Sequence, residues 1–82
     1  MAKFYPPFEI AERLGRRMVE IDAPDVRALL RDGSAIAGTD LEAEAKRWAI
    51  LVNGRNIRYL DGFRTRLGPD DEVFFVKGSG GG

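Results

Sequence analysis

The sequence lacks cysteine and histidine, the two residue types that most often carry protein chemistry. Without cysteine there is no disulfide, no thiolate metal site and no cysteine nucleophile. Without histidine the chain has neither the commonest general base nor the commonest metal ligand. We therefore expect no metal site, and any reactive group must come from another part of the chain.

The chain also has no excess of either charge sign and no long hydrophobic run. Thirteen basic residues balance thirteen acidic ones, which argues against a partner chosen by bulk charge, such as nucleic acid or an anionic membrane. No apolar run approaches the ~20 residues of a membrane span, and the opening "MAKFYPPF" has no apolar secretory core. We expect a cytoplasmic protein that binds neither nucleic acid nor a membrane.

Apolar residues are plentiful enough for one small domain. The 82 residues are 44% hydrophobic, and a chain of this length buries only about 60% of its unfolded surface when it folds. The apolar patterning ends at Lys77, and only glycine and serine follow it. We predict a folded domain over residues 1–77 and a flexible glycine-rich tail over residues 78–82.

The first part of the chain predicts two strands with a short helix between them. Residues 3–8 are rich in aromatics, but Pro6 and Pro7 interrupt the pattern because proline cannot donate to a strand ladder. The apolar spacing in "EIAERLG" is helical, and Gly15 ends it. "RRMVEID" then alternates apolar and polar residues, which predicts a second strand paired with the first.

The next segment predicts the main helix. Apolar residues within 26–30 recur at i, i+3 and i+4, which is one helical stripe. Asp22 or Ala23 is expected at the cap, with Pro24 near the first helical position. Gly33 is expected to stop the helix, and "SAIAG" then reads as a connector of small residues.

The second half predicts another helix and at least two strands. "TDLEAEAKR" begins with capping residues and continues with strong helix formers. Residues 48–52 are apolar on both faces, which is typical of a strand inside a sheet. Asn53-Gly54 predicts a tight turn, and Pro69 predicts a second turn because proline favours its second position. Residues 72–77 are then predicted to form the last strand.

This order of elements predicts the fold class. A hairpin cannot bring the last strand to the middle of a mixed sheet, yet its apolar run is typical of burial on both faces. We therefore predict an α+β protein with the β-grasp, or ubiquitin-like, fold. In it a mixed sheet of four or five strands packs on one main helix.

The glycine tail predicts the reactive part of the chain. Glycine has no Cβ, so Gly80 and Gly81 can thread a narrow channel, and another active site can approach the Gly82 carboxylate from all sides. A carboxylate is inert at neutral pH, but an acyl adenylate made with ATP can be attacked by sulfur or by an amine. The alternative is a linker without function, since glycine-rich ends are commonly disordered. The position of the tail, directly after the closing strand, favours a function.

Around this tail the chain resembles the MoaD/ThiS family of ubiquitin-like sulfur carriers over most of its length. The resemblance rests on the order of the strands, on "ILVNG" at the end of the central strand (residues 50–54) and on "LDGFRTRLGPDDEVFFV" running into Gly81 and Gly82. The residues that match the family's turn L-x-x-G-D-E-V are Leu67, Asp71, Glu72 and Val73. The length is closer to the MoaD branch, whereas Gly68-Pro69-Asp70 departs from the usual turn.

The resemblance implies a sulfur-carrying subunit and not an enzyme. A MoeB/ThiF-like enzyme of the ubiquitin-activating type would adenylate the Gly82 carboxylate with ATP, and sulfur transfer would give a C-terminal thiocarboxylate. Gly80 and Gly81 would thread into a MoaE-like large subunit of molybdopterin synthase. There the sulfur would pass to a pterin precursor of the molybdenum or tungsten cofactor. The chain itself would bind no cofactor.

The last strand also supplies candidates for the surface that meets these partners. Phe74 and Phe75 are adjacent, so in a strand their side chains point to opposite faces. We expect one of them in the core and the other at the partner surface, with Lys77 as a further contact. Arginines concentrate in residues 55–66, and the acidic residues Asp61, Asp70 and Asp71 in and after this segment indicate a solvated face.

Four functions remain open on the sequence. The first is a sulfur carrier for molybdopterin-type cofactors, which we rank ahead on length and on the final strand. The second is a ThiS-like carrier for thiamin or another thio-metabolite. The third is a ubiquitin-like modifier joined through Gly82 to a lysine of a target protein. The fourth is a β-grasp interaction module that ends in a glycine linker.

Overall fold

The computed structural model describes residues 1–77, which form five strands, three α-helices and two 3-10 turns. The strands are β1 (Ala2–Tyr5), β2 (Val19–Ile21), β3 (Trp48–Val52), β4 (Arg55–Asn56) and β5 (Glu72–Lys77). The helices are α1 (Phe8–Leu14), α2 (Val26–Ala37) and α3 (Leu41–Glu44), and the 3-10 turns are η1 (Ile57–Tyr59) and η2 (Gly62–Arg64). The predicted tail over 78–82 lies outside the described residues.

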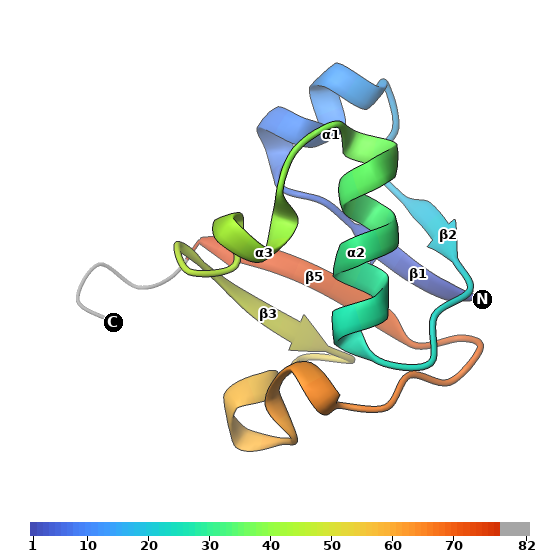
Figure 1. Cartoon of the computed structure of the whole chain (residues 1–82), viewed down its shortest axis with the longest axis vertical. Coiled ribbons are helices and arrows are strands. Elements are labelled where there is room, and N and C mark those ends of the chain that lie inside the picture. The colour runs from blue at the N-terminus through green and yellow to red at the C-terminus, as the bar shows by residue number, and fades with distance from the viewer. Residues whose placement is uncertain (78–82) are drawn as a thin grey trace.

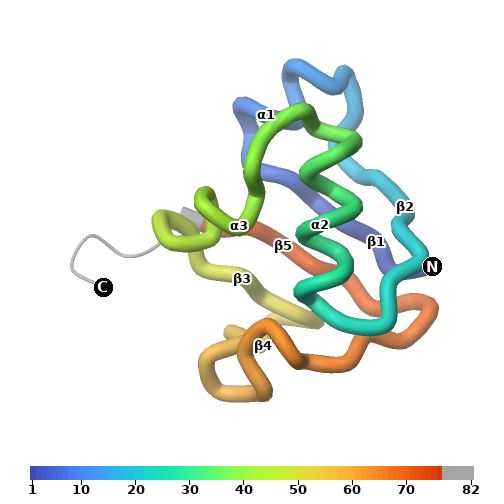
Figure 2. Tube along the Cα trace, in the orientation of Figure 1, coloured from blue at the N-terminus to red at the C-terminus, as the bar shows by residue number. Residues whose placement is uncertain are grey.

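The five strands form one mixed sheet in the order β2-β1-β5-β3-β4. The last strand, β5, is central: it runs parallel to β1 and antiparallel to β3, so segments from the two halves of the chain lie side by side (Figure 2). The helix α2 crosses one face of this sheet (Figure 1). This arrangement is the β-grasp fold, and the predicted fold class is confirmed.

The hydrophobic core lies between α2 and one face of the sheet. Strand alternation turns Phe4 and Phe75 inward, where their rings meet edge to face with centroids 5.6 Å apart. Val26, Leu29 and Leu30 of α2 are 0% exposed, which confirms the predicted helical stripe. Burial of one such side chain contributes roughly 1.5–3 kcal/mol. Packing against the sheet therefore stabilises this helix more than its propensity does.

The two prolines end β1 and lead directly into α1. Pro7 is the N-cap of α1, and its carbonyl oxygen accepts from the Ala11 N–H at 2.9 Å. Phe8 is therefore the first residue of the helix and not the end of the strand, as its aromatic character had suggested. Gly15 ends α1 in the left-handed conformation with φ of 70°, as predicted.

The main helix begins later than its sequence predicts. Asp25, and neither Asp22 nor Ala23, is the N-cap, because its Oδ1 accepts from the Ala28 N–H at 2.8 Å. Pro24 consequently lies before the helix and not at its first position. The first N–H groups of a helix have no carbonyl partner within the helix, and the side chain of an N-cap aspartate accepts from one of them.

The main helix also continues past its predicted end. It runs through Gly33 to Ala37 and ends at Gly38, whose φ of 69° is left-handed. Gly33 is buried, and a Cβ there would lie 2.9 Å from Leu41 Cδ1 and 3.4 Å from Phe4 Cε2. The predicted stop and the predicted connector "SAIAG" are therefore wrong. Glycine occurs at position 33 because the helix has to approach the core closely.

We predict that Gly33→Val destabilises the domain by about 2–3 kcal/mol, because overpacking a filled core costs about 1–3 kcal/mol. The matched control is Ala35→Val on the exposed face of the same helix, which should cost only the propensity difference of a few tenths of a kcal/mol. Urea unfolding of both variants gives the two free energies. Equal losses would show that Gly33 is not a packing position.

Two predicted local signals are confirmed before and after β3. Asp40 caps α3 by accepting from the N–H groups of Glu42 at 3.0 Å and Ala43 at 3.2 Å, although the helix has only four residues. Asn53 and Gly54 both have positive φ, at 52° and 86°. This is the pattern of a two-residue hairpin turn, for which Asn-Gly is the preferred pair.

Candidate functional site

The chain leaves the sheet from the end of its central strand. In the antiparallel pairing of β5 with β3, Lys77 lies opposite Trp48. The Trp48 indole Nε1–H donates to Glu44 Oε2 at 3.2 Å, so α3 is attached to the sheet at this point. The predicted reactive and threading residues Gly80, Gly81 and Gly82 lie outside the described residues. The described part thus places their attachment point at the end of the central strand, where residues 75–77 pair with β3 alone.

An apolar surface lies on the open face of the sheet, opposite α2. It is formed by apolar residues on the outward side of three neighbouring strands, and we call it the open-face patch: Tyr5, Ala49, Leu51, Phe74 and Val76. Lys3 and Glu72 lie on the same face and border the patch. The rings of Tyr5 and Phe74 are stacked, with centroids 4.1 Å apart and planes 6° apart. Val76 is 36% exposed. A contiguous apolar face of this kind is typical of an interaction surface.

A hydrogen bond fixes the aromatic pair. The Tyr5 hydroxyl donates to Glu72 Oε2 at 3.0 Å. This bond to the neutral phenol, together with burial and the nearby carboxylate charge, raises the pKa of Tyr5. Tyr5 therefore stays protonated at neutral pH, and its ring is held over Phe74. The open-face patch is thus preorganised in the free protein.

The sequence-predicted interface residues have different positions. Phe75 is 6% exposed and belongs to the core, whereas Phe74 is half-buried on the open face. The prediction that the two rings separate to opposite faces is confirmed. Lys77 is the last residue of β5. Tyr5 was not among the predicted interface residues, although strand alternation places it there: Phe4 points to the core, so its neighbour must point outward.

The turn before β5 is held by Asp71, one of the residues that matched the family pattern. Asp71 Oδ2 accepts from the Gly68 N–H at 2.7 Å, and Oδ1 accepts from Asn53 Nδ2 at 2.9 Å. Asn53 in turn accepts from the Glu72 N–H through its Oδ1 at 2.9 Å. The Asn-Gly turn after β3 and the turn before β5 are therefore joined, and β5 begins at a fixed register.

These bonds make the turn sensitive to acid. The backbone bond from Gly68, and then the side-chain bond from Asn53, hold the pKa of Asp71 below its ordinary 3.8. Because the pKa is lower in the folded state than in the unfolded chain, the charged carboxylate stabilises the fold at any pH above the ordinary pKa. This stability is lost as the pH falls through the folded pKa.

We predict that Asp71→Asn lowers the free energy of unfolding by about 1 kcal/mol at neutral pH. The difference from the parent should shrink as the pH falls below the ordinary pKa of 3.8 and through the lower pKa of the folded parent. The matched control is Asp70→Asn in the same turn, whose side chain makes no hydrogen bond within residues 1–77. Urea unfolding at neutral and acid pH gives both numbers. A difference that stays constant with pH contradicts the role assigned to the carboxylate.

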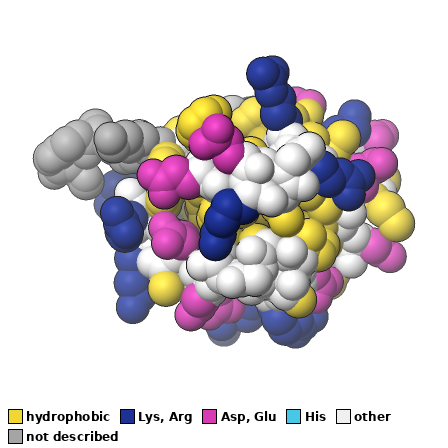
Figure 3. All heavy atoms as spheres, turned by 90° about the horizontal axis from the view of Figure 1, so that it is seen from above, with side chains coloured by type: hydrophobic (Ala, Val, Ile, Leu, Met, Phe, Trp, Pro, Cys, Tyr) yellow, Lys and Arg dark blue, Asp and Glu magenta, His cyan; other side chains and the backbone are white. Residues whose placement is uncertain are grey.

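Charged side chains are mixed over the surface. The four arginines of the turn region, Arg55, Arg58, Arg64 and Arg66, are all exposed. The face seen from above carries basic and acidic side chains interspersed among apolar ones (Figure 3). Within residues 1–77, the one ion pair closer than 4 Å joins Arg31 and Asp32 at 3.6 Å. These observations agree with the predicted solvated character of the arginines.

Two further properties of the described residues concern membranes and metals. None of the helices in residues 1–77 is both long and apolar enough to cross a membrane. Over the same residues, no three aspartate or glutamate side chains gather in a way that could hold a metal ion.

Comparison with known proteins gives one relative of close sequence and several of similar fold. A protein of Archaeoglobus fulgidus that bears the provisional name sulfur carrier protein is 41% identical over 73 residues, which cover 78% of this chain and 83% of the relative. No family model matches the chain. The relative is long enough and similar enough to show the family.

Solved structures show the same fold over the whole chain. The small archaeal modifier protein SAMP1 of Methanosarcina acetivorans superposes with a TM-score of 0.70 at 21% identity, covering 99% of this chain and 95% of that one. SAMP1 of Haloferax volcanii gives 0.72 at 18% identity, covering 99% and 98%. A chain of the Amycolatopsis orientalis BexX/CysO complex gives 0.77 at 15% identity and covers 100% of both chains.

The fold and the sheet order define a ubiquitin-like β-grasp protein. With the sulfur-carrier relative beside them, the chain belongs to the MoaD/ThiS-type family of ubiquitin-like sulfur carriers.

Proposed function

We propose that this protein carries sulfur as a thiocarboxylate at Gly82, which a MoeB/ThiF-like enzyme first activates with ATP. The observation that carries the proposal is the placement of β5. In a chain of the sulfur-carrier family, the strand that leads into the glycines is the central strand of the sheet. It pairs with β1 over residues 72–74 and with β3 over residues 73–77, up to the last residue before the tail. A rigid base for a glycine tail suits delivery of a carboxylate into another protein's active site.

The proposed chemistry has two balanced steps. A carboxylate oxygen of Gly82 attacks the α-phosphorus of ATP, and pyrophosphate leaves, which gives an acyl adenylate. A hydrosulfide equivalent then attacks the acyl carbon, and AMP leaves with the electrons of the broken C–O bond. The product is the thiocarboxylate. All of the catalytic groups belong to the partners, so the chain acts as a co-substrate and not as an enzyme.

We further propose that the open-face patch is the docking surface for these partners, with Phe74 at its centre. Phe74 lies between Tyr5 on one neighbouring strand and Leu51 on the other. Preorganised aromatic rings lose little side-chain entropy when they bind, and aromatic residues are enriched in interface hot spots. The final acceptor in our proposal is a MoaE-like subunit of molybdopterin synthase in the cytoplasm, which delivers the sulfur to a molybdenum or tungsten cofactor.

A second candidate function is conjugation to proteins. It is favoured by the two SAMP1 structures, which are named as modifier proteins and share the fold over nearly the whole chain. In that case the activated Gly82 carbonyl would be attacked by a lysine amine, and an isopeptide bond would replace the thiocarboxylate. A ThiS-like role in thiamin or other thio-metabolite synthesis would use the same thiocarboxylate with a different acceptor.

The test loads the chain with sulfur and then offers it each acceptor separately. We expect a large molybdopterin synthase subunit with a pterin precursor to convert the thiocarboxylate back to the carboxylate, with sulfur found in the pterin. Discharge by a thiazole synthase alone would favour the ThiS-like role. Lysine-linked conjugates in an extract supplied with ATP, without sulfur transfer to any small molecule, would replace the carrier proposal by the modifier.

A further inference from the structure

One edge of β3 is partly unpaired. On one side β3 pairs with β5 along its whole length, but on the other side β4 pairs only with Leu51 and Val52. The Asn53 N–H donates to the Glu72 carbonyl oxygen at 2.8 Å. Because backbone groups alternate in direction along an antiparallel ladder, those of Trp48 and Ile50 point away from β5. In residues 1–77 no turn, cap or loop hydrogen bond uses the backbone of residues 48–50.

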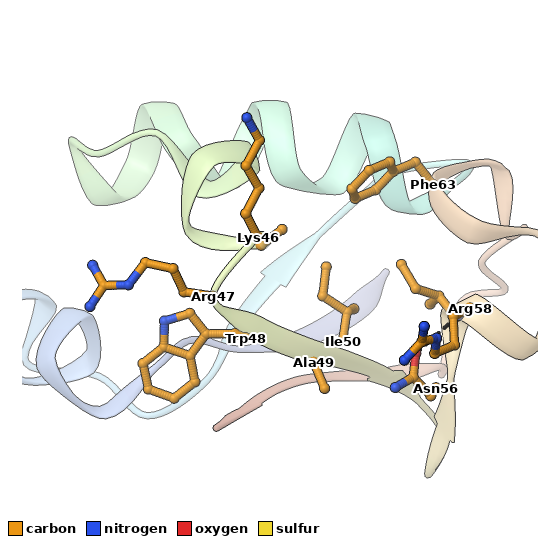
Figure 4. Close-up of a pocket in the computed structure, with 10 residues that line it drawn as sticks. Lys46, Arg47, Trp48, Ala49, Ile50, Asn56, Arg58 and Phe63 are labelled. Carbon is orange, nitrogen blue, oxygen red and sulfur yellow. Dashed lines mark hydrogen bonds between the residues drawn. The ribbon is translucent and has the colours of Figure 1, made fainter. Parts of the chain in front are cut away.

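A hollow of about 280 Å³ lies beside this free edge. Its apolar lining includes Ile50, Ile57 and Phe63. Ile50 and Ile57 are buried at 3% and 8% exposed, whereas Phe63 is 39% exposed. Figure 4 shows Ile50 pointing from β3 into the space, with Lys46 on one side and Phe63 on the other, whereas Ala49 points to the opposite face. An extended chain laid along the edge would place every second side chain on the side of the hollow.

The border of the hollow is basic, although the whole chain is neutral. Lys46, Arg47 and Arg58 line it and are exposed, and none of its lining residues is acidic. The Arg27 guanidinium lies 5.7 Å from the centre of the Phe63 ring and adds a fourth positive charge nearby. The nearby Glu44 is not one of the lining residues. Its carboxylate accepts a hydrogen bond from the Trp48 indole, and Glu44 lines a neighbouring hollow with Pro7 and Ile10.

We propose that this β3 edge binds an extended acidic segment of a partner protein as an added strand, with one apolar side chain seated between Ile50 and Phe63. Backbone hydrogen bonds to an open edge and a pocket for alternate side chains are the two elements of strand addition. A second copy of the chain is the wrong occupant, because two-fold pairing of this edge would bring the same basic residues face to face. The proposal does not depend on the chemistry of the tail: the β3 edge could bind a peptide in a protein that carries no sulfur, and the reverse also holds.

The direct test uses the whole protein, labelled for NMR, and a short synthetic peptide of alternating valine and glutamate. We expect amide shifts at Trp48 and Ile50, with slower hydrogen exchange of both amides on binding. The same peptide with lysine in place of glutamate should bind at least about tenfold more weakly. The glutamate peptide with a proline at its centre should also bind more weakly, because proline has no backbone N–H to donate to the neighbouring strand.

Variants test the charges separately. The double variant Lys46→Glu with Arg58→Glu should weaken binding of the valine-glutamate peptide by at least about tenfold. The control Arg17→Glu changes an exposed arginine in the loop between α1 and β2 and should leave the affinity unchanged. The proposal is overturned by absent binding, by shifts confined to Tyr5 and Phe74, by equal affinity for the lysine peptide, or by an unaffected double variant. Self-association of the free protein through residues 48–50 would overturn it as well.

Discussion

Deletion of Gly82 is expected to reduce sulfur loading by at least about a hundredfold. The reaction requires the terminal carboxylate to reach the α-phosphorus of ATP in the active site of the activating enzyme. Loss of one residue withdraws the carboxylate by up to roughly 3.5 Å, and a misplacement of even 1 Å costs about a hundredfold in rate. Addition of a residue after Gly82 should block loading for the same reason.

The control for this deletion keeps the length of the chain. Ser79→Ala changes a tail side chain but leaves the carboxylate at the same distance from β5, so loading should stay close to that of the parent. Both variants should unfold with the parent's free energy, because the buried core residues lie between Ala2 and Phe75. Equal loading of the shortened and parent chains would mean that Gly82 is not the reactive residue.

The neighbouring residues Phe74 and Phe75 should give opposite results when each is replaced by alanine. Phe75→Ala should lower the free energy of unfolding by about 3–5 kcal/mol, because it removes a buried ring that packs on Phe4. Phe74→Ala should cost only about 1 kcal/mol, since it removes the stacking on Tyr5 from a half-buried site. Its larger effect should be on binding to the activating enzyme, where loss of an interface anchor costs about 2 kcal/mol, or roughly thirtyfold.

Urea unfolding and a binding titration, applied to both variants, separate the two roles. The titration is read at a temperature where each variant is folded, so that Phe75→Ala reports its affinity and not its stability. If Phe74→Ala binds the activating enzyme as tightly as the parent does, the open-face patch is not the docking surface. If it instead loses as much stability as Phe75→Ala, the ring at position 74 belongs to the core.

Much of the fold follows from short-range patterns in the sequence. The stripe over residues 26–30, the Asn53-Gly54 turn and the apolar run of β5 each have one favoured structure, and each is confirmed. The errors arose where tertiary packing decides. Gly33 was expected to stop a helix, but it faces Leu41 across the core, and a contact between residues eight apart leaves no local signal. The N-cap of α2 was likewise predicted too early in the chain, because Pro24 is compatible both with the first position of a helix and with the residue before its cap.

The candidate site was predictable in kind but not in arrangement. Alternation within the last strand showed that Phe74 and Phe75 separate, whereas only the sheet order decides which face α2 covers. The stacking of Tyr5 on Phe74 depends on the parallel pairing of β1 with β5, which joins the two ends of the domain. The open edge at residues 48–50 had no sequence signal, because it results from the shortness of β4.

The central claim, that Gly82 carries sulfur, is tested most directly by intact-mass measurement after reaction. The parent chain is incubated with an activating enzyme, ATP and a sulfide donor, and parallel samples omit ATP or contain the chain without Gly82. We expect the parent alone, and only with ATP, to gain the mass difference between sulfur and oxygen, with fragmentation placing the change on the last residue. An unchanged mass in the complete reaction, or the same gain in the shortened chain, would contradict the account.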